Sequence, residues 1–284
     1  MKPCIFLLIF FVCCTCSKKD EIDRNVLFNN TITIIGHGGA GFQTGRKPYP
    51  TNSLLSIHKA IDLYAAEGVE VDVQLSKDSV IVMFHDEFMD GYTSCSGYIS
   101  DLNWNEIKRC RYREDFAVSN FLDERIASLE ELLKIHQFAE SRPYIFLDTK
   151  YYQNSQRGYY QFYKTLEDQI VALCKTYNYQ NHLIVESHDL LFLLKVKKRI
   201  PELQVFFGGN FEKDFELVVQ NGLDGMTLKN NEVSKEQVSR AHLLNKKIAI
   251  FLINDRKTTV DAISKNPDFI QTDNILLAQQ VLMH

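Results

Sequence analysis

The order of its apolar segments restricts the fold of this chain more than any other feature. From residue 32 onward, short strand-like runs alternate with amphipathic helical patterns. The strand-like runs are 31–36, 69–75, 80–84, 144–148, 183–187, 204–207, 223–228, 247–253 and 268–271. Helical patterns lie between most of them, at 53–66, 128–140, 157–177, 188–199, 212–220, 234–245 and 256–264. This alternation predicts a parallel sheet with helices on its faces, and the number of repeats favours a closed barrel.

The strand count suggests that the barrel is distorted. There is one run more than eight strands require, and no helix separates 69–75 from 80–84, whereas parallel neighbours need a long crossover. We therefore predict an α/β fold, a distorted TIM (β/α)8 barrel in which these two runs form a hairpin at the rim. A turn-rich insertion at about 86–127 follows the third strand-like run. We expect it to cover the catalytic face and to shape substrate access; the alternative is a passive surface loop.

The N-terminal residues differ in character from the rest. The apolar run at 5–12 is too short to span a membrane, which is typical of a signal peptide. Cysteines and then charged residues follow it, as in a bacterial lipoprotein signal, so we expect a lipid anchor at Cys16 with Cys14 as the other candidate. An ordinary cleaved secretory signal is the alternative. The expected segments are a signal peptide (1–16), a tether (17–31) and the barrel (32–284).

This leader predicts a location in the cell envelope, on the periplasmic or surface side of a membrane. Three cysteines lie beyond it, and Cys95 and Cys110 fall in the insertion, where they could form a disulfide; the alternative is that all three, including Cys174, are small buried hydrophobic residues. The net charge of −4 gives no broad basic surface, so we expect no nucleic-acid partner.

Acidic residues and a histidine interrupt the apolar hairpin on one face. Glu70 and Asp72 are two positions apart, so their side chains point the same way along a strand. If 77–78 form a two-residue turn, Glu70 lies opposite His85 and Asp72 lies opposite Met83. Carboxylates this close repel each other, and a divalent cation removes that conflict. The alternative is a solvent-facing strand pair with scattered polar residues.

Two further strand ends carry residues of the same kind. Asp148 ends the run 144–148, and Lys150 follows two positions later on the same side. Carboxylate ligands suit Ca²⁺ or Mg²⁺. His37 follows the first strand, so it also lies at the catalytic face of a barrel, and two histidines at one phosphate can divide acid and base work.

These motifs resemble the glycerophosphodiester phosphodiesterase family, and the likeness extends over residues 32–284. The resemblance implies divalent-metal-dependent hydrolysis of a small-molecule glycerophosphodiester to glycerol 3-phosphate and an alcohol. The segments that carry it are 37–39, 50–53, 68–78, 82–86, 128–133, 147–150 and 269–273. The roles it implies are metal ligation by Glu70, Asp72 and Asp148, phosphate contact by Lys150, and base and acid catalysis by His37 and His85, in an order that the sequence does not settle.

The chain departs from the family pattern near the phosphate. Gly38 replaces an Arg, Thr51 replaces a Glu, and Asp148 replaces a longer Glu. Backbone N–H groups of 38–41 could contact the phosphate instead, or these glycines could serve a turn with positive φ. Arg46 could replace the lost guanidinium. Two alternatives therefore stay open: a phosphodiesterase of the same fold that acts on a phosphoinositide or sphingolipid, and a non-catalytic binding lipoprotein.

Overall fold

The computed structural model describes residues 32–42, 49–113, 123–137, 139, 141–152 and 157–283. The expected signal peptide and tether, Cys16 and Arg46 lie outside these residues. Within them, no helix combines the length and the apolar character needed to cross a membrane.

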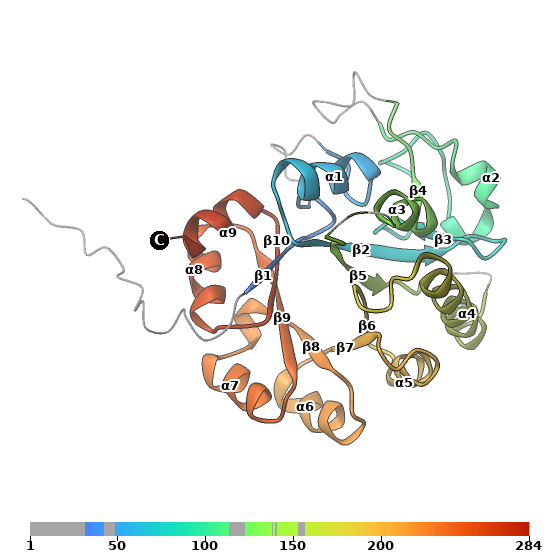
Figure 1. Ribbon diagram of the computed structural model, residues 1–284. Helices are drawn as coiled ribbons and strands as arrows, with labels where there is room; N and C mark the ends of the chain where they lie inside the picture. Colours follow the sequence, from blue (N-terminus) through green and yellow to red (C-terminus); the bar gives the residue numbers. More distant parts are fainter. Residues whose placement is uncertain are drawn as a thin grey trace, which may run out of the picture.

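Eight parallel strands close into a barrel, which confirms the predicted α/β barrel fold (Figure 1). Each strand pairs with its neighbours in parallel, and β1 closes the ring by pairing with both β10 and β2. In barrel order the strands are β1 (Thr33–Gly36), β2 (Gly68–Leu75), β5 (Tyr144–Thr149), β6 (Leu183–Ser187), β7 (Gln204–Gly208), β8 (Gly225–Lys229), β9 (Lys247–Ile253) and β10 (Phe269–Thr272).

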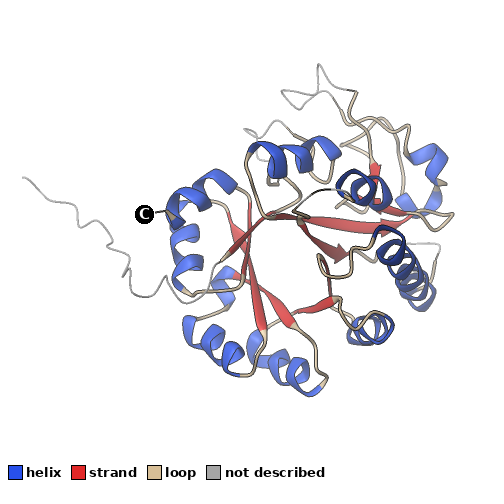
Figure 2. Cartoon of the chain, viewed as in Figure 1, coloured by secondary structure: helices blue, strands red, loops and turns tan. Residues whose placement is uncertain are grey.

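Helices form an outer ring around the strands (Figure 2). Several begin with a side-chain cap from the loop that leaves a strand; for example, Asp189 and Asn210 accept hydrogen bonds from the first turns of α5 and α6. The helices are α1 (Leu54–His58) with a π-helical continuation (Lys59–Leu63), α3 (Leu129–His136), α4 (Tyr159–Tyr177), α5 (Leu190–Arg199), α6 (Phe211–Gln220), α7 (Lys235–Leu243), α8 (Arg256–Ser264) and α9 (Ile275–Leu282), with a 3₁₀ turn at Asn230–Glu232. The sequence patterns did not predict α9.

The predicted hairpin forms, but only its second run lies outside the barrel, because β2 is itself a barrel strand. This second run forms β3 (Ile81–Met83), which pairs antiparallel with β2 and with the two-residue β4 (Ala127–Ser128). The predicted register was wrong by one residue: Val73 pairs with Met83, and the backbone N–H of Phe84 donates to the carbonyl oxygen of Asp72. The turn causes this shift, because Ser79 adopts a φ of 73° and closes a three-residue connection instead of a two-residue one.

The insertion builds a small core of its own beside β3. It includes a 3₁₀ turn (Ile99–Asp101) and α2 (Trp104–Ile107). Cys95 and Cys110 form a disulfide across it, whereas Cys174 is unpaired and buried elsewhere. The apolar residues that hold the insertion on the hairpin are Val82, Phe84, Met89, Ile99, Ile107, Cys110, Tyr112 and Ile126.

Side chains inside the barrel form two layers. The lower layer is apolar and consists of Ile35, Phe146, Ile184, Phe206, Ala249 and Phe269. Alternate residues of a strand face the same side, so the residues two positions further along these strands line the mouth. They are His37, Asp148, Glu186, Gly208, Phe251 and Gln271. The apolar layer closes the floor, and the site lies above it at the C-terminal ends of the strands.

Candidate active site

A hollow of about 690 Å³ opens at the C-terminal mouth of the barrel. It brings together six of the seven predicted site residues, although they come from four separate segments of the chain. These residues are His37, Glu70, Asp72, His85, Asp148 and Lys150. The seventh, Arg46, lies outside the described residues.

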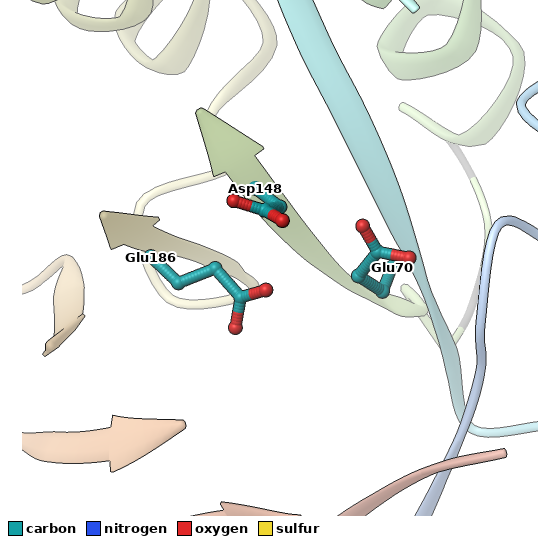
Figure 3. A group of neighbouring side chains, drawn as sticks. All are labelled: Glu70, Asp148 and Glu186. Carbon is teal, nitrogen blue, oxygen red and sulfur yellow. The ribbon is translucent and has the colours of Figure 1, made fainter. Parts of the chain in front are cut away.

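Three carboxylates converge at the centre of this hollow. Glu70, Asp148 and Glu186 each offer an oxygen within 4.8 Å of the others, and Figure 3 shows the three side chains pointing toward one another. Burial, followed by the charges of Asp72 and its acidic neighbours, raises the pKa of Glu70 well above its ordinary value. Burial and the charge of Asp148 likewise raise the pKa of Glu186 to about 8. A set of hard oxygen donors with this charge conflict fits Ca²⁺ or Mg²⁺.

Asp72 faces the same hollow but has other partners. Its Oδ1 lies 3.1 Å from the Lys150 Nζ, and its Oδ2 accepts a hydrogen bond of 2.7 Å from the side chain of Asn52. Lys150 also pairs with Asp148 at 2.5 Å. Burial would lower the pKa of Lys150, but the two aspartates outweigh it and raise the pKa. The sequence predicted Glu70, Asp72 and Asp148 as one cluster, whereas the carboxylates that meet are Glu70, Asp148 and Glu186.

His37 is oriented by a carboxylate from the last strand of the barrel. Its Nδ1 lies 3.0 Å from Asp273 Oδ1, and its Nε2 lies 3.9 Å from Glu70 Oε2. The backbone N–H of Phe42 donates to the same Asp273 oxygen at 2.8 Å. The Phe42 ring contacts both histidines, with its centroid 4.3 Å from that of His37 and 5.0 Å from that of His85. One oxygen of Asp273 therefore positions both the imidazole of His37 and the segment that carries the Phe42 ring.

His85 follows β3 and reaches over the mouth from the hairpin. Its Nδ1 lies 3.2 Å from Asp86 Oδ1. This hydrogen bond raises the pKa of His85 against the opposing effect of burial. A carboxylate at Nδ1 fixes the ring orientation and leaves Nε2 to exchange a proton with a bound group.

Three consecutive carbonyl groups around His85 accept hydrogen bonds from the barrel. The side-chain amide of Gln74, which is buried, donates to the carbonyl oxygens of Phe84 and Asp86, each at 2.8 Å. The hydroxyl of Tyr152 donates to the carbonyl oxygen of His85. The loop that carries the imidazole is therefore fastened to β2 and to the segment after β5.

The glycine turn after β1 uses three of its backbone N–H groups within the protein. Gly38, Gly39 and Gly41 all have positive φ, as the turn interpretation predicted. The N–H of Gly38 donates to Glu70 Oε2 at 2.9 Å, that of Gly39 to the Gly36 carbonyl, and that of Ala40 to Ser56 Oγ. The hypothesis that these groups bind phosphate is wrong for those three donors, because each already has a partner inside the protein.

Sequence reasoning missed two carboxylates of the site. Glu186 stands next to last in the apolar run Leu183–Ser187, and it pairs in register with Asp148, which itself pairs with Asp72. Its Oε2 accepts hydrogen bonds from Thr227 at 2.6 Å and Gln271 at 3.1 Å. An acid inside a buried strand was the available signal. Asp273 follows β10 directly, and only the closed barrel shows that it meets His37.

Comparison with known proteins identifies similar proteins in one family of phosphodiesterases. The model of the glycerophosphoryl diester phosphodiesterase family matches residues 44–277, a range that begins after His37. A glycerophosphodiester phosphodiesterase from Caldanaerobacter subterraneus is 29% identical over 173 residues, which cover 61% of this chain and 64% of that relative. The chain thus matches less than two thirds of that relative's length. A glycerophosphodiester phosphodiesterase from Bacillus altitudinis is 24% identical over 239 residues, covering 79% of this chain and 89% of its own.

A solved structure shares the architecture. The phosphodiesterase OLEI02445 from Oleispira antarctica, solved in complex with its product sn-glycerol-3-phosphate, superposes with a TM-score of 0.75 at 21% identity. The superposition covers 89% of this chain and 97% of that one. At this identity the likeness establishes the fold.

Proposed function

Because this chain belongs to the glycerophosphoryl diester phosphodiesterase family, we propose that it hydrolyses glycerophosphodiesters to glycerol 3-phosphate and an alcohol. The observation that carries the proposal is the meeting of two carboxylate-oriented histidines, three clustered carboxylates and Lys150 in one hollow. Each of these groups has a use at a phosphodiester, and the barrel brings them together from strands far apart in the sequence.

The carboxylates Glu70, Asp148 and Glu186 would hold a divalent cation, Ca²⁺ or Mg²⁺. When bound, such a cation offsets the charge of the diester and the charge that develops on its oxygens. Asp72 lies next to this set and orients Lys150, whose ammonium would contact a phosphate oxygen.

The two histidines would divide the proton transfers. His37, held at Nδ1 by Asp273, would take the proton of the attacking hydroxyl or water. His85 is held by Asp86, whose hydrogen bond raises its pKa and so favours the protonated ring, and it would give that proton to the leaving alkoxide. Phe42 contacts both rings.

The test is release of glycerol 3-phosphate from purified glycerophosphodiesters, before and after exhaustive chelation and then with Ca²⁺ or Mg²⁺ restored. We expect chelation to abolish turnover and one of the cations to restore it. Full activity in chelator would refute the metal-dependent mechanism. No release from any glycerophosphodiester in the presence of either cation would refute the function itself.

We also propose that Cys16 carries a lipid anchor and that the barrel works in the cell envelope. The Cys95–Cys110 disulfide supports this location, since disulfides persist in oxidising compartments. Cys16→Ser, Cys14→Ser and the double variant should be expressed in a bacterium that processes lipoproteins. Membrane fractionation and mass spectrometry of the N-terminus should show a lipidated cysteine that the double variant lacks. A double variant that is processed and still sediments with membranes would contradict the anchor.

A further inference from the structure

A second hollow, of about 240 Å³, adjoins the first and is lined by none of the clustered carboxylates Glu70, Asp148 and Glu186. It shares Phe42 and His85 with the larger hollow, so these two side chains form the boundary between them. A diester whose phosphate lies among Glu70, Asp148 and Lys150 has its leaving oxygen within reach of His85 only if the alcohol points toward this boundary. The alcohol would then extend into the second hollow.

The walls of this hollow are aromatic and acidic. Phe42, Phe84, Tyr92 and Tyr112 contribute rings, and Asp86 contributes a carboxylate. The described residues that line it include no Lys and no Arg. Ring faces carry negative charge density, so they attract a cation without requiring it to donate a hydrogen bond.

The charged groups that act on the Tyr112 hydroxyl in this hollow are carboxylates. The charged groups that, after burial, raise the pKa of the Tyr112 hydroxyl are three carboxylates, Glu124, Asp86 and Asp72. Among the described residues of the insertion, Arg113 directs its guanidinium Nε to the carbonyl of Thr93 at 3.2 Å. Arg111 is held by Asp123 at 2.8 Å. His85 also lines the hollow, and its Nδ1 is paired with Asp86. The ring faces together with Glu124 and Asp72 therefore favour a positive head group over an anionic one.

We propose that this hollow, hereafter the head-group pocket, binds the alcohol part of the substrate and selects a trimethylammonium group. The proposal rests on the proposed function. A quaternary ammonium has no N–H group to satisfy, so aromatic faces and one carboxylate are enough to hold it, whereas a primary ammonium would leave donors unpaired. A cavity of about 150 Å³ holds the six heavy atoms of benzene, and a trimethylammonioethyl group also has about six. The head-group pocket is large enough.

The insertion, and not the barrel, supplies the distinctive walls. Tyr92 and Tyr112 both belong to it, and the Cys95–Cys110 disulfide lies between them in the sequence. The hydroxyl of Tyr112 donates to the Thr51 carbonyl at 3.3 Å, which ties the insertion to the first loop of the barrel. Selectivity for the head group would thus depend on the insertion, which the sequence predicted to lie over the catalytic face.

The test compares kcat/KM for four glycerophosphodiesters with trimethylammonioethyl, aminoethyl, glyceryl and inositol head groups. The wild-type protein should prefer the first over the glyceryl substrate by about tenfold or more. Tyr92→Leu should lower kcat/KM for the trimethylammonioethyl substrate by about five- to thirty-fold, and change the glyceryl rate by less than about twofold. Tyr92→Phe keeps the ring and should keep the preference.

Phe88→Leu is the matched control. Phe88 lies on the same insertion and is 43% exposed against 44% for Tyr92, but it packs on Tyr98 outside the head-group pocket. It should leave all four rates unchanged. Equal rates for the four substrates, or a Tyr92→Leu variant with the wild-type preference, would overturn the proposal while leaving the phosphodiesterase function intact.

A binding arm keeps the proposal testable without turnover. Tetramethylammonium should bind the wild-type protein in a titration calorimeter or by NMR, and Tyr92→Leu should weaken that binding while Phe88→Leu should not. If no diester is hydrolysed but tetramethylammonium binds through Tyr92, the phosphodiesterase function fails and the cation pocket stands. If neither hydrolysis nor binding occurs, both fail.

Discussion

Replacement of Glu186 by glutamine should stabilise the metal-free protein at alkaline pH. Glu186 is buried and faces Glu70 and Asp148, and these surroundings raise its pKa from 4.5 to about 8. A carboxyl with a raised pKa binds its proton more tightly when the protein is folded. The contribution of Glu186 to the free energy of unfolding therefore falls as the pH rises from 4.5 to 8. In this range the unfolded chain releases the proton, whereas the folded protein must keep it or hold a buried charge.

The size of the effect follows from that shift. One pKa unit corresponds to about 1.36 kcal/mol, so ionisation of Glu186 costs the metal-free fold roughly 1 kcal/mol at pH 5 and roughly 4 kcal/mol at pH 8. Glutamine has the same shape and no charge, and its amide oxygen can still accept the hydrogen bond from Thr227. We expect the advantage of the Glu186→Gln variant over the wild type in the free energy of unfolding to grow by about 3 kcal/mol between pH 5 and pH 8.

Urea unfolding in excess chelator, at several pH values from 5 to 8, measures this difference in the free energy of unfolding directly. Glu232→Gln is the matched control, because Glu232 lines the same hollow but is exposed and pairs with Lys229. It should leave the pH dependence unchanged. With Ca²⁺ or Mg²⁺ present, the wild type should be more stable than Glu186→Gln, since ligand binding stabilises the protein that binds the cation more tightly. Parallel pH profiles for the wild type and Glu186→Gln in chelator would refute the reasoning.

Three other outcomes can be checked by standard measurements. His37→Ala and His85→Ala should each lower kcat by about 10²-fold or more, with an unchanged circular dichroism spectrum; near-normal turnover of either would remove that histidine from the mechanism. Gln74→Leu should lower kcat by about tenfold, because it removes the hydrogen bonds that hold the loop of His85. In a double-mutant cycle, the same change should have no further effect on kcat in the His85→Ala background. Replacing Cys95 and Cys110 with serine should lower the free energy of unfolding in urea by about 3 kcal/mol, as expected for a loop of this length, and an unchanged value would contradict a stabilising disulfide.

The barrel could be predicted because local sequence determines most of it. The strands are apolar runs of the right length, and the helices between them have clear amphipathic patterns, so the alternation alone indicates the architecture. The register of the hairpin could not be predicted in this way. It depends on the φ of Ser79, a residue without glycine's freedom that adopts a left-handed conformation in the loop. Helix α9 was missed although Ile275, Ala278 and Val281 are buried at a spacing of three residues, which is a helical signal.

The site was predictable where its residues are neighbours in the sequence, and unpredictable where closure of the barrel brings them together. Glu70 and Asp72 share one strand, and their common orientation follows from strand geometry. The arrival of Glu186 beside them does not, because it depends on the pairing of β6 with β5. Lys150 takes one oxygen of Asp72, and Asn52 takes the other. Asp273 reaches His37 only because β10 pairs with β1.

The shorter acid at Asp148 and the additional acid at Glu186 are connected by the register of the barrel. Asp148 stands where the resemblance implies a glutamate, a side chain that is one methylene longer. Glu186 pairs with it on the next strand, at the same height above the apolar layer, and has the longer side chain. Thr227 and Gln271 hold that side chain toward Glu70 and Asp148. Glu70, Asp148 and Glu186 thus form one acidic cluster, and Asp72 beside it contacts Lys150.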